Sequence, residues 1–149
     1  MLELSQITNT LWIGSRPEED SDYTYIAALG VQFVVDLTSG IGYDEVDNEE
    51  EWIQRGVKYI NIPIVDMCPP DDANIEALKK AVFPMISSGF ITYIHCRLGK
   101  GRAPTIAIFY LITEEGYSFD NAMTLVKNSH DFSFLNYEQY DFLRRLKND

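Results

Sequence analysis

The stretch YIHCRLGKGRAPTIAIFYLI, residues 93–112, decides the fold of this chain. It starts at the end of an apolar run, FITYIH (90–95), which is typical of a buried central strand. One cysteine, two glycines and three cations follow within seven residues, and a second apolar segment begins near Ala103. Pro104 suits the first turn of a helix, where its missing N–H costs no hydrogen bond. The stretch therefore predicts a strand, a tight loop and a helix, in that order.

The segments around this stretch repeat the alternation of strand and helix. Ser21 or Asp22 is the expected cap of the first helix, and Pro84 is expected to kink or shorten the helix that contains it. The pattern predicts an α/β fold with a central, mostly parallel sheet of about four to five strands flanked by helices, and a helical C-terminal third. The length of 149 residues fits one domain, 1–149. Strands are expected at 10–15, 31–38, 57–64 and 90–95, and helices at 21–30, 47–56, 73–89, 103–115, 118–128 and 136–147.

The composition argues against several classes of protein. The formal net charge of −11 disfavours nucleic-acid binding, and without an apolar run of about 18 residues we expect no membrane span. The N-terminus lacks the basic start and apolar block of a secretion signal. The two cysteines, Cys68 and Cys96, predict no disulfide framework and a cytoplasmic protein, although a protective pair between them stays open. We expect the protein to be a monomer. The acidic run DEVDNEEE, 44–51, is interpreted as a solvated surface.

The loop after the central strand has the composition of an anion site. Five residues separate Cys96 from Arg102. A strand that turns sharply into a helix lets successive backbone N–H groups point into one concavity, where the helix N-terminus adds its positive dipole end. Gly99 and Gly101 supply the backbone freedom for such a turn, including positive φ, and Arg102 can bind two phosphate oxygens. Beside these cations and the helix N-terminus, Cys96 is expected to act as a thiolate that attacks a bound phosphoryl group and forms a cysteinyl-phosphate.

The leaving oxygen then needs a proton, and the segment INIPIVDMCPPDD, 60–72, offers three carboxylates. Asp66 lies just past a predicted strand end, at the edge where parallel sheets bind their ligands. Asp71 and Asp72 precede a predicted helix and suit its N-terminal cap. Asp66 is therefore the candidate general acid, with a plain turn-forming role as the alternative.

The order of these features resembles a known family. His-Cys-x5-Arg between a strand and a helix resembles the signature of the cysteine-dependent protein tyrosine phosphatase superfamily, and an aspartate upstream in so short a chain is similar to its dual-specificity branch. The segments LWIGSRP, LGVQFVVDLT, YINIPIVDM and NYEQYDFL look like the flanking elements of that family. The resemblance covers most of the chain. It implies a tyrosine-phosphatase-like fold and the hydrolysis of phosphotyrosine, and also of phosphoserine and phosphothreonine, in proteins.

The resemblance also implies a role for each residue of the loop. Cys96 is the nucleophile, Arg102 is the phosphate clamp, and Asp66 is the general acid and then the base for water. His95 orients the cysteine from behind the loop. No metal or organic cofactor is implied, and the substrate is a phosphorylated protein or another phosphate ester. The phosphate-binding loop (P-loop) consists of Arg97, Leu98, Gly99, Lys100, Gly101 and Arg102.

Two features depart from the commonest pattern of the family and leave the substrate open. Many members have Ser or Thr directly after the arginine, whereas this chain has Ala103, and Thr105 points to another helix face because each residue turns by about 100°. The run GRAP resembles the plant glucan phosphatases, and Arg97 with Lys100 resembles a phosphoinositide-directed phosphatase. The alternatives are a phosphatase of a phosphoinositide or phosphoglucan, or a slow phospho-binding pseudophosphatase.

Overall fold

The apolar run at 90–95 forms the centre of the sheet. It contains β5 (Thr92–Cys96), the middle strand of a five-stranded sheet with the order β1-β2-β5-β3-β4. This computed structural model describes residues 2–130 and 135–146. The other strands are β1 (Leu4–Thr8), β2 (Leu11–Ser15), β3 (Phe33–Asp36) and β4 (Lys58–Asn61). The helices are α1 (Asp20–Ala28), α2 (Glu49–Gln54), α3 (Asp72–Ala77), α4 (Phe83–Ser87), α5 (Arg102–Glu114), α6 (Phe119–Ser129) and α7 (Tyr137–Arg144), with a π-helical turn at Leu78–Val82.

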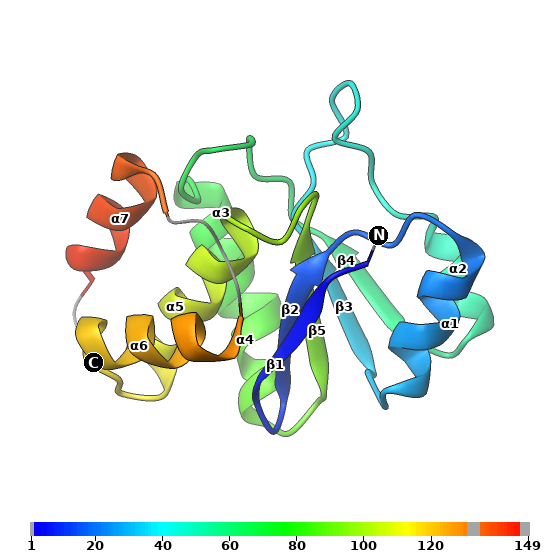
Figure 1. Cartoon of the computed structure of the whole chain (residues 1–149), viewed down its shortest axis with the longest axis horizontal. Coiled ribbons are helices and arrows are strands. Elements are labelled where there is room, and N and C mark those ends of the chain that lie inside the picture. Colours follow the sequence, from blue (N-terminus) through cyan, green and yellow to red (C-terminus); the bar gives the residue numbers. More distant parts are fainter. Residues whose placement is uncertain (1, 131–134, 147–149) are drawn as a thin grey trace.

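Four of the five strands run parallel. β2, β5, β3 and β4 share one direction, and only the edge strand β1 pairs antiparallel, with β2. Cys96 therefore lies beside Ser15, and His95 beside Asp36, at the carboxyl edge of the sheet. The arrowheads of β2 and β5 point to that edge in Figure 1. The predicted mostly parallel α/β sheet and the helical C-terminal third are confirmed.

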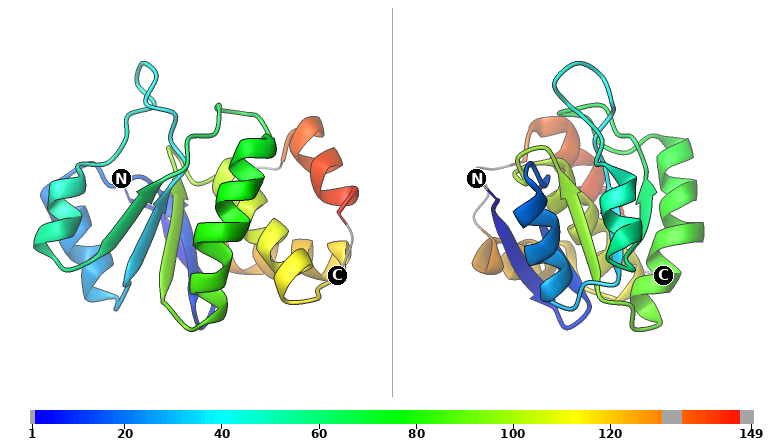
Figure 2. Two further views of the ribbon diagram at one scale, coloured as in Figure 1. Left: turned by 180° about the vertical axis from the view of Figure 1, so that it is seen from behind. Right: turned by 90° about the vertical axis from the view of Figure 1, so that its right-hand side faces the viewer.

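Helices cover both faces of the sheet, because alternate strand residues face opposite sides. Val34 and Tyr93 pack with Trp52 in the core beneath α1 and α2. Val35 and Ile94 pack in the larger core with the helices from α3 to α7. Figure 2 shows these two helical layers on either side of the strands. α5 runs through the larger core and is buried along nearly its whole length, so the loop before it is anchored at both ends.

The helix caps agree with the sequence in part. Asp71 caps α3, as predicted, because its carboxylate accepts a hydrogen bond from the backbone of Asn74. The prediction of Ser21 or Asp22 as the cap of α1 is wrong, because the cap is Glu19, two residues before Ser21. The carboxylate of Asp22 accepts a hydrogen bond from the backbone N–H of Glu19 and so completes a capping box from inside the helix.

Two other elements differ from the sequence-based expectation. The helix expected at 73–89 is divided by the π-helical turn, and Pro84 lies in the first turn of α4, where it needs no N–H partner. The edge strand at 4–8 is not predicted by its sequence pattern, and its pairing with β2 is interrupted between Gln6 and Thr8. The last residue of the helix expected at 136–147 lies outside the described residues.

The acidic run 44–51 is not a solvated surface throughout. Asp44 and Asp47 are both buried. The carboxylate of Asp44 accepts hydrogen bonds from the backbone and hydroxyl of Ser39 and from Arg102. The carboxylate of Asp47 accepts a hydrogen bond from the indole N–H of Trp52 at 3.0 Å. Hydrogen-bond donors from nearby residues, and from Arg102 58 positions away, therefore make burial of these two carboxylates possible.

His95, fully buried at the end of β5, lies between two carboxylates. Its Nε2 is 2.7 Å from an oxygen of Asp47 and 3.9 Å from an oxygen of Asp36. Burial alone disfavours the imidazolium ion, but the charges of Asp47 and Asp36 outweigh burial and raise the pKa of His95 to about 9. The protonated ring therefore joins β3, β5 and the loop before α2 beneath the carboxyl edge of the sheet.

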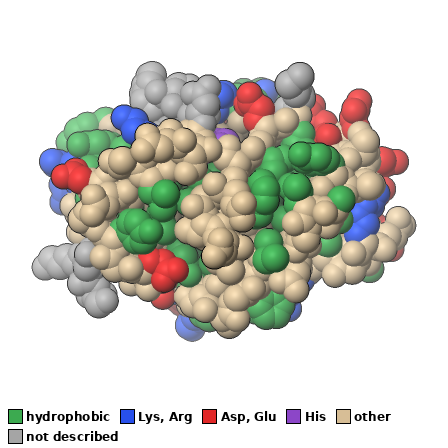
Figure 3. All heavy atoms as spheres, turned by 60° about the horizontal axis from the view of Figure 1, so that its bottom comes forward, with side chains coloured by type: hydrophobic (Ala, Val, Ile, Leu, Met, Phe, Trp, Pro, Cys, Tyr) green, Lys and Arg blue, Asp and Glu red, His purple; other side chains and the backbone are tan. Residues whose placement is uncertain are grey.

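The opposite face of the molecule, at the amino ends of the parallel strands, is shown in Figure 3. Hydrophobic side chains lie there in separate patches between polar and backbone atoms. The loops described below leave the other ends of the strands. Over residues 2–130 and 135–146, no helix combines the length and apolarity that crossing a membrane requires.

The charge on His95 predicts that stability falls between pH 6.5 and about 9. Unfolded His95 titrates near 6.5, so the folded chain binds a proton in this window that the unfolded chain lacks. The stabilising contribution is full below pH 6.5 and is lost as the pH rises through about 9. Each unit of pKa difference corresponds to about 1.4 kcal/mol of unfolding free energy. Urea unfolding at several pH values across the window measures the slope.

Asp47→Asn is the matched variant for this measurement, because it keeps the shape of the side chain and removes its charge. We expect the unfolding free energy of the variant to change less over the same pH window. Equal slopes for the wild-type and variant proteins would show that His95 is not held in its charged form by Asp47.

Candidate active site

The loop between β5 and α5 folds around the sulfur of Cys96. This side chain is buried, and the backbone N–H of Gly99 donates to its Sγ at 3.2 Å. Gly99 has φ = +76°, and a Cβ on it would lie 2.6 Å from the carbonyl carbon of Gly14 in β2. Only glycine meets both conditions. The prediction of positive φ is confirmed for Gly99 and wrong for Gly101, which has φ = −137°.

α5 begins directly after this loop. Arg102 is its first residue, one residue before the predicted start. Its cap is Gly101, which has no side chain to bond the free N–H groups. Pro104 lies in the first turn, as the sequence predicts. The first N–H groups of a helix lack partners within the helix and carry the positive end of its dipole. The start of α5 therefore offers donors for an anion beside Cys96.

Arg102 is buried, and both terminal nitrogens of its guanidinium group have oxygen partners. Nη1 and Nη2 each lie 2.9 Å from an oxygen of Asp44, which makes a two-point ion pair. Nη1 also donates to the backbone carbonyls of Ile64 at 2.9 Å and Leu37 at 3.3 Å. Burial of Asp44 opposes its ionisation, but the hydrogen bonds from Arg102 and Ser39 outweigh burial and lower the pKa of Asp44 to about 2. The pair is therefore charged at neutral pH.

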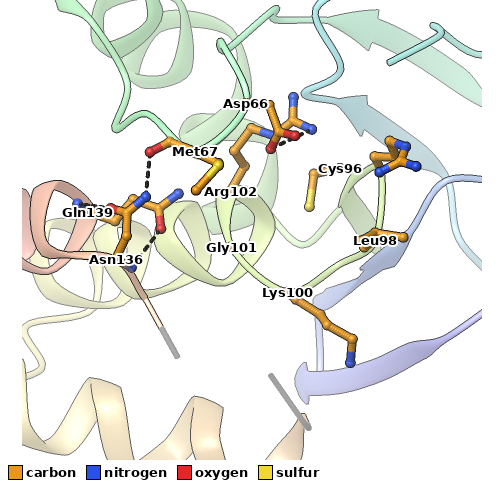
Figure 4. A pocket seen from close by; sticks show the side chains of 10 residues that line it. Asp66, Met67, Cys96, Leu98, Lys100, Gly101, Arg102, Asn136 and Gln139 are labelled. Carbon is orange, nitrogen blue, oxygen red and sulfur yellow. Dashed lines mark hydrogen bonds and ion pairs between the residues drawn. The ribbon is translucent and has the colours of Figure 1, made fainter. Parts of the chain in front are cut away.

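Asp66 reaches over the loop from the segment that follows β4. One of its carboxylate oxygens is 3.4 Å from Nη2 of Arg102, and its side chain is 54% exposed. Figure 4 shows the carboxylate beside the guanidinium group and on the same side of the pocket as Cys96. The structure thus brings together the three side chains that the sequence singles out for phosphoryl chemistry.

A pocket of about 350 Å³ opens over the sulfur. Two of its lining residues, Asn136 and Gln139 at the start of α7, are not predicted from the sequence. The Asn-x-x-Gln spacing marks a helix cap, but it does not indicate which part of the fold that cap approaches. The lining residues are Asp66, Met67, Cys96, Arg97, Leu98, Lys100, Gly101, Arg102, Asn136 and Gln139 (Figure 4).

The backbone of residues 97–101 curves around the sulfur of Cys96 and is called the cup below. The two additional cations of the loop have partners outside the cup. The guanidinium carbon of Arg97 lies 4.6 Å from the ring centre of Tyr43, a distance typical of a cation–π contact. Nζ of Lys100 lies 3.6 Å from a carboxylate oxygen of Glu3. The side chain of Leu98, between them, is exposed. Arg97 and Lys100 therefore line the mouth of the pocket and are shared with an aromatic ring and a carboxylate.

His95, Ala103 and Thr105 lie around the cup without entering it. Nδ1 of His95 is 3.3 Å from the backbone carbonyl of Cys96, so the ring contacts the backbone behind the sulfur. The methyl group of Ala103 is fully buried. The hydroxyl of Thr105 donates to the carbonyl of Gly101 at 2.7 Å, one helical turn back. Its proton is committed to this bond, as expected for a side chain on another helix face.

Beneath the loop, Asp36, Asp47 and His95 present ligand atoms within 4.8 Å of one another, a spacing that suits a metal ion. The carboxylate of Asp36, however, already accepts hydrogen bonds from the backbone of Thr38 and Asp47 and from the hydroxyl of Tyr59. An imidazolium nitrogen has no lone pair to offer a metal. The cluster therefore fits a charged histidine held by two carboxylates better than a metal centre.

Known proteins that are similar to this chain in sequence include phosphatases. A protein of Invertebrate iridescent virus 6 whose name places it among tyrosine phosphatases (197R) is 32% identical over 123 residues, which are 78% of this chain and 44% of that protein. The human phosphatidylglycerophosphatase and protein-tyrosine phosphatase 1 is 25% identical over 101 residues, 67% of this chain and 50% of that protein. The chain therefore spans about half the length of these two relatives.

The fold and the family agree. The crystal structure of Tk-PTP in the active form aligns with a TM-score of 0.83 and 23% identity, over 97% of this chain and 95% of that one, which shows a shared fold. The family model PTP-SAK, described as the Swiss Army Knife protein DSP-PTPase phosphatase domain, matches residues 6–148. Because this match covers nearly the whole sequence, the chain belongs to the PTP-SAK family of DSP-PTPase phosphatase domains.

Proposed function

We propose that this chain, as one catalytic domain over 1–149, hydrolyses phosphotyrosine, and also phosphoserine and phosphothreonine, in proteins. The observation that carries the proposal is one pocket that holds the buried sulfur of Cys96, the buried guanidinium of Arg102 and the carboxylate of Asp66. Membership of a phosphatase family supports it. A buried thiol beside a buried cation and the start of a helix suits covalent attack on an anionic phosphate.

Substrate phosphate binds in the cup of backbone N–H groups from residues 97–101. Within the described part of the chain, every contact of the Arg102 guanidinium involves Nη1 or Nη2. Nε is therefore the donor for a phosphate oxygen, while Asp44 keeps the group in place. Donors fixed in this way before the substrate arrives stabilise the charge that develops on the phosphoryl oxygens.

The chemistry proceeds in two displacements. The sulfur of Cys96 attacks phosphorus, the bond from phosphorus to the leaving oxygen breaks, and Asp66 gives its proton to that oxygen. The products are a cysteinyl-phosphate and the dephosphorylated hydroxyl group. Asp66, now a carboxylate, takes a proton from water as the water oxygen attacks phosphorus. The sulfur leaves as a thiolate, and inorganic phosphate is released for each water molecule consumed.

Ala103 affects the second displacement more than the first. It offers no hydroxyl to the departing sulfur, and the hydroxyl of Thr105 is bonded to the carbonyl of Gly101. The N–H of Gly99, 3.2 Å from the sulfur, is the donor that remains for the thiolate. Slow hydrolysis of the phosphoenzyme would make the protein a phospho-binding pseudophosphatase, and steady turnover beyond one equivalent of product distinguishes the enzyme from that alternative.

A non-protein phosphate ester is the second candidate substrate. The human relative is named for phosphatidylglycerophosphatase as well as protein-tyrosine phosphatase activity. The exposed apolar side chains of Met67 and Leu98 line the pocket and can contact an acyl chain as well as an aromatic ring. A substrate with several phosphates is disfavoured, because Arg97 and Lys100 are already shared with Tyr43 and Glu3.

A substrate panel tests this order of preference. We expect kcat/KM for phosphotyrosine peptides to exceed that for vesicles containing phosphatidylglycerol phosphate by at least about tenfold, equivalent to about 1.4 kcal/mol of transition-state stabilisation. Inositol lipids with two or more phosphates are expected to be the poorest substrates. A preference for phosphatidylglycerol phosphate would replace the protein-directed proposal by the lipid one.

Replacement of the nucleophile tests the reaction itself. Cys96→Ser is expected to abolish release of the phenol from an aryl phosphate in the presence of a chelator, because an alcohol does not ionise at neutral pH. Cys68→Ser is the matched control, since Cys68 is exposed and lies outside the pocket lining, and it should retain wild-type kcat. Turnover by Cys96→Ser at the wild-type rate would end the proposal.

Replacement of the acid tests the role of Asp66. Asp66→Asn is expected to lower kcat/KM about 100-fold or more for alkyl or poorly activated aryl phosphates, and much less for aryl phosphates with acidic phenols, which leave without a proton. Asp71→Asn is the control, because Asp71 serves as the cap of α3. If Asp71→Asn shows the leaving-group dependence and Asp66→Asn does not, the acid is misassigned.

A further inference from the structure

The residue after the candidate acid has an unusual backbone. Among residues 2–130 and 135–146, Met67 is the only non-glycine residue with positive φ, at +69°. The backbone N–H of Cys68 donates to the carbonyl of Val65 at 3.0 Å, so Asp66 and Met67 are the two central residues of a hydrogen-bonded turn. Glycine or asparagine is usual at the second of these positions when φ is positive. A methionine there costs about 1–3 kcal/mol and persists only where its surroundings hold it.

Asn136, distant in sequence, holds this turn. Its amide Nδ2 donates to the carbonyl of Met67 at 2.5 Å, across 69 positions of the chain. Its Oδ1 accepts from the backbone N–H of Gln139 at 2.9 Å and so caps α7. Both ends of one amide are therefore in use, and the side chain bridges the start of α7 and the turn. Figure 4 shows this bridge beside the pocket, with Asp66 on the far side of Met67.

We propose that Asn136 is a positioning residue that holds Asp66 over the sulfur of Cys96 through the strained turn at Met67. The proposal rests on the proposed function, in which Asp66 protonates the leaving oxygen. The carbonyl that Asn136 binds belongs to the residue next to Asp66. Relaxation of Met67 to negative φ would therefore reorient the peptide bonds that set the position of the Asp66 carboxylate. Displacement of a reacting group by about 1 Å can cost on the order of 100-fold in rate.

The two functions of Asn136 can be separated by substitution. Aspartate caps a helix as well as asparagine does, so Asn136→Asp keeps the acceptor for Gln139 and replaces the donor to Met67 by an oxygen. Asn136→Ser keeps a capping hydroxyl without adding charge, and its short side chain does not reach Met67. Glu138→Gln is the matched control, because Glu138 is exposed in the same first turn and lies outside the pocket lining.

The test is kcat/KM for a series of aryl phosphates with phenols of rising pKa. Asn136→Asp and Asn136→Ser should both make kcat/KM fall more steeply as the pKa of the phenol rises. We expect kcat/KM to fall about tenfold or more for the poorest leaving groups and to change little for the best. Glu138→Gln should follow the wild-type line. Adding Asn136→Asp to Asp66→Asn should leave the slope unchanged, because the acid is already absent.

Failure of this inference and failure of the proposed function give different results. If Asp66→Asn steepens the decline but both Asn136 variants keep the wild-type slope, or lose activity equally for all leaving groups, Asn136 does not position the acid. A further steepening in the double variant would also overturn the inference. If Asp66→Asn itself keeps the wild-type slope, the acid assignment in the proposed function is wrong, and the inference falls with it.

Discussion

Arg102 places a positive charge in the interior at the start of α5, and the carboxyl edge of the sheet is organised around it. A buried charge is tolerated only when it is paired and hydrogen-bonded, and here Asp44 and the carbonyls of Leu37 and Ile64 supply the acceptors. These partners come from the segments that follow β3 and β4. Breaking a buried pair on one side typically costs about 3–5 kcal/mol. One guanidinium group therefore ties three segments together at the place where an anion is expected to bind.

A second set of contacts supports the cup from below and from the side. The imidazolium of His95 links Asp36 at the end of β3 to Asp47 before α2. The loop also approaches the backbone of Gly14 and Ser15 in β2 so closely that Gly99 has no room for a side chain. Rigid donors that need no rearrangement at the moment of reaction are the main source of electrostatic catalysis. Asp66 differs, because it lies on an exposed turn whose position depends on a strained residue.

The sequence predicts what is encoded by neighbouring residues. The strand, loop and helix around Cys96 are predicted because their signals lie within about twenty positions, as is the cap at Asp71. The edge strand β1 is missed because five residues of mixed polarity gain their stability only from pairing with β2. The burial of Asp44 is missed because its partner Arg102 lies 58 positions away. The bridge from Asn136 to Met67 spans 69 positions, and no local pattern announces it.

The central claim is that the loop from Cys96 to Arg102 binds a phosphate and transfers it to the sulfur. Mass spectrometry of protein quenched during turnover of an aryl phosphate tests this claim most directly, because it locates the transferred group on the chain. The account predicts one phosphoryl group, on the peptide that contains Cys96. Steady turnover with a phosphoryl group on another side chain would contradict it. So would the absence of any phosphoryl group at every time point, with a substrate whose first displacement is faster than the second.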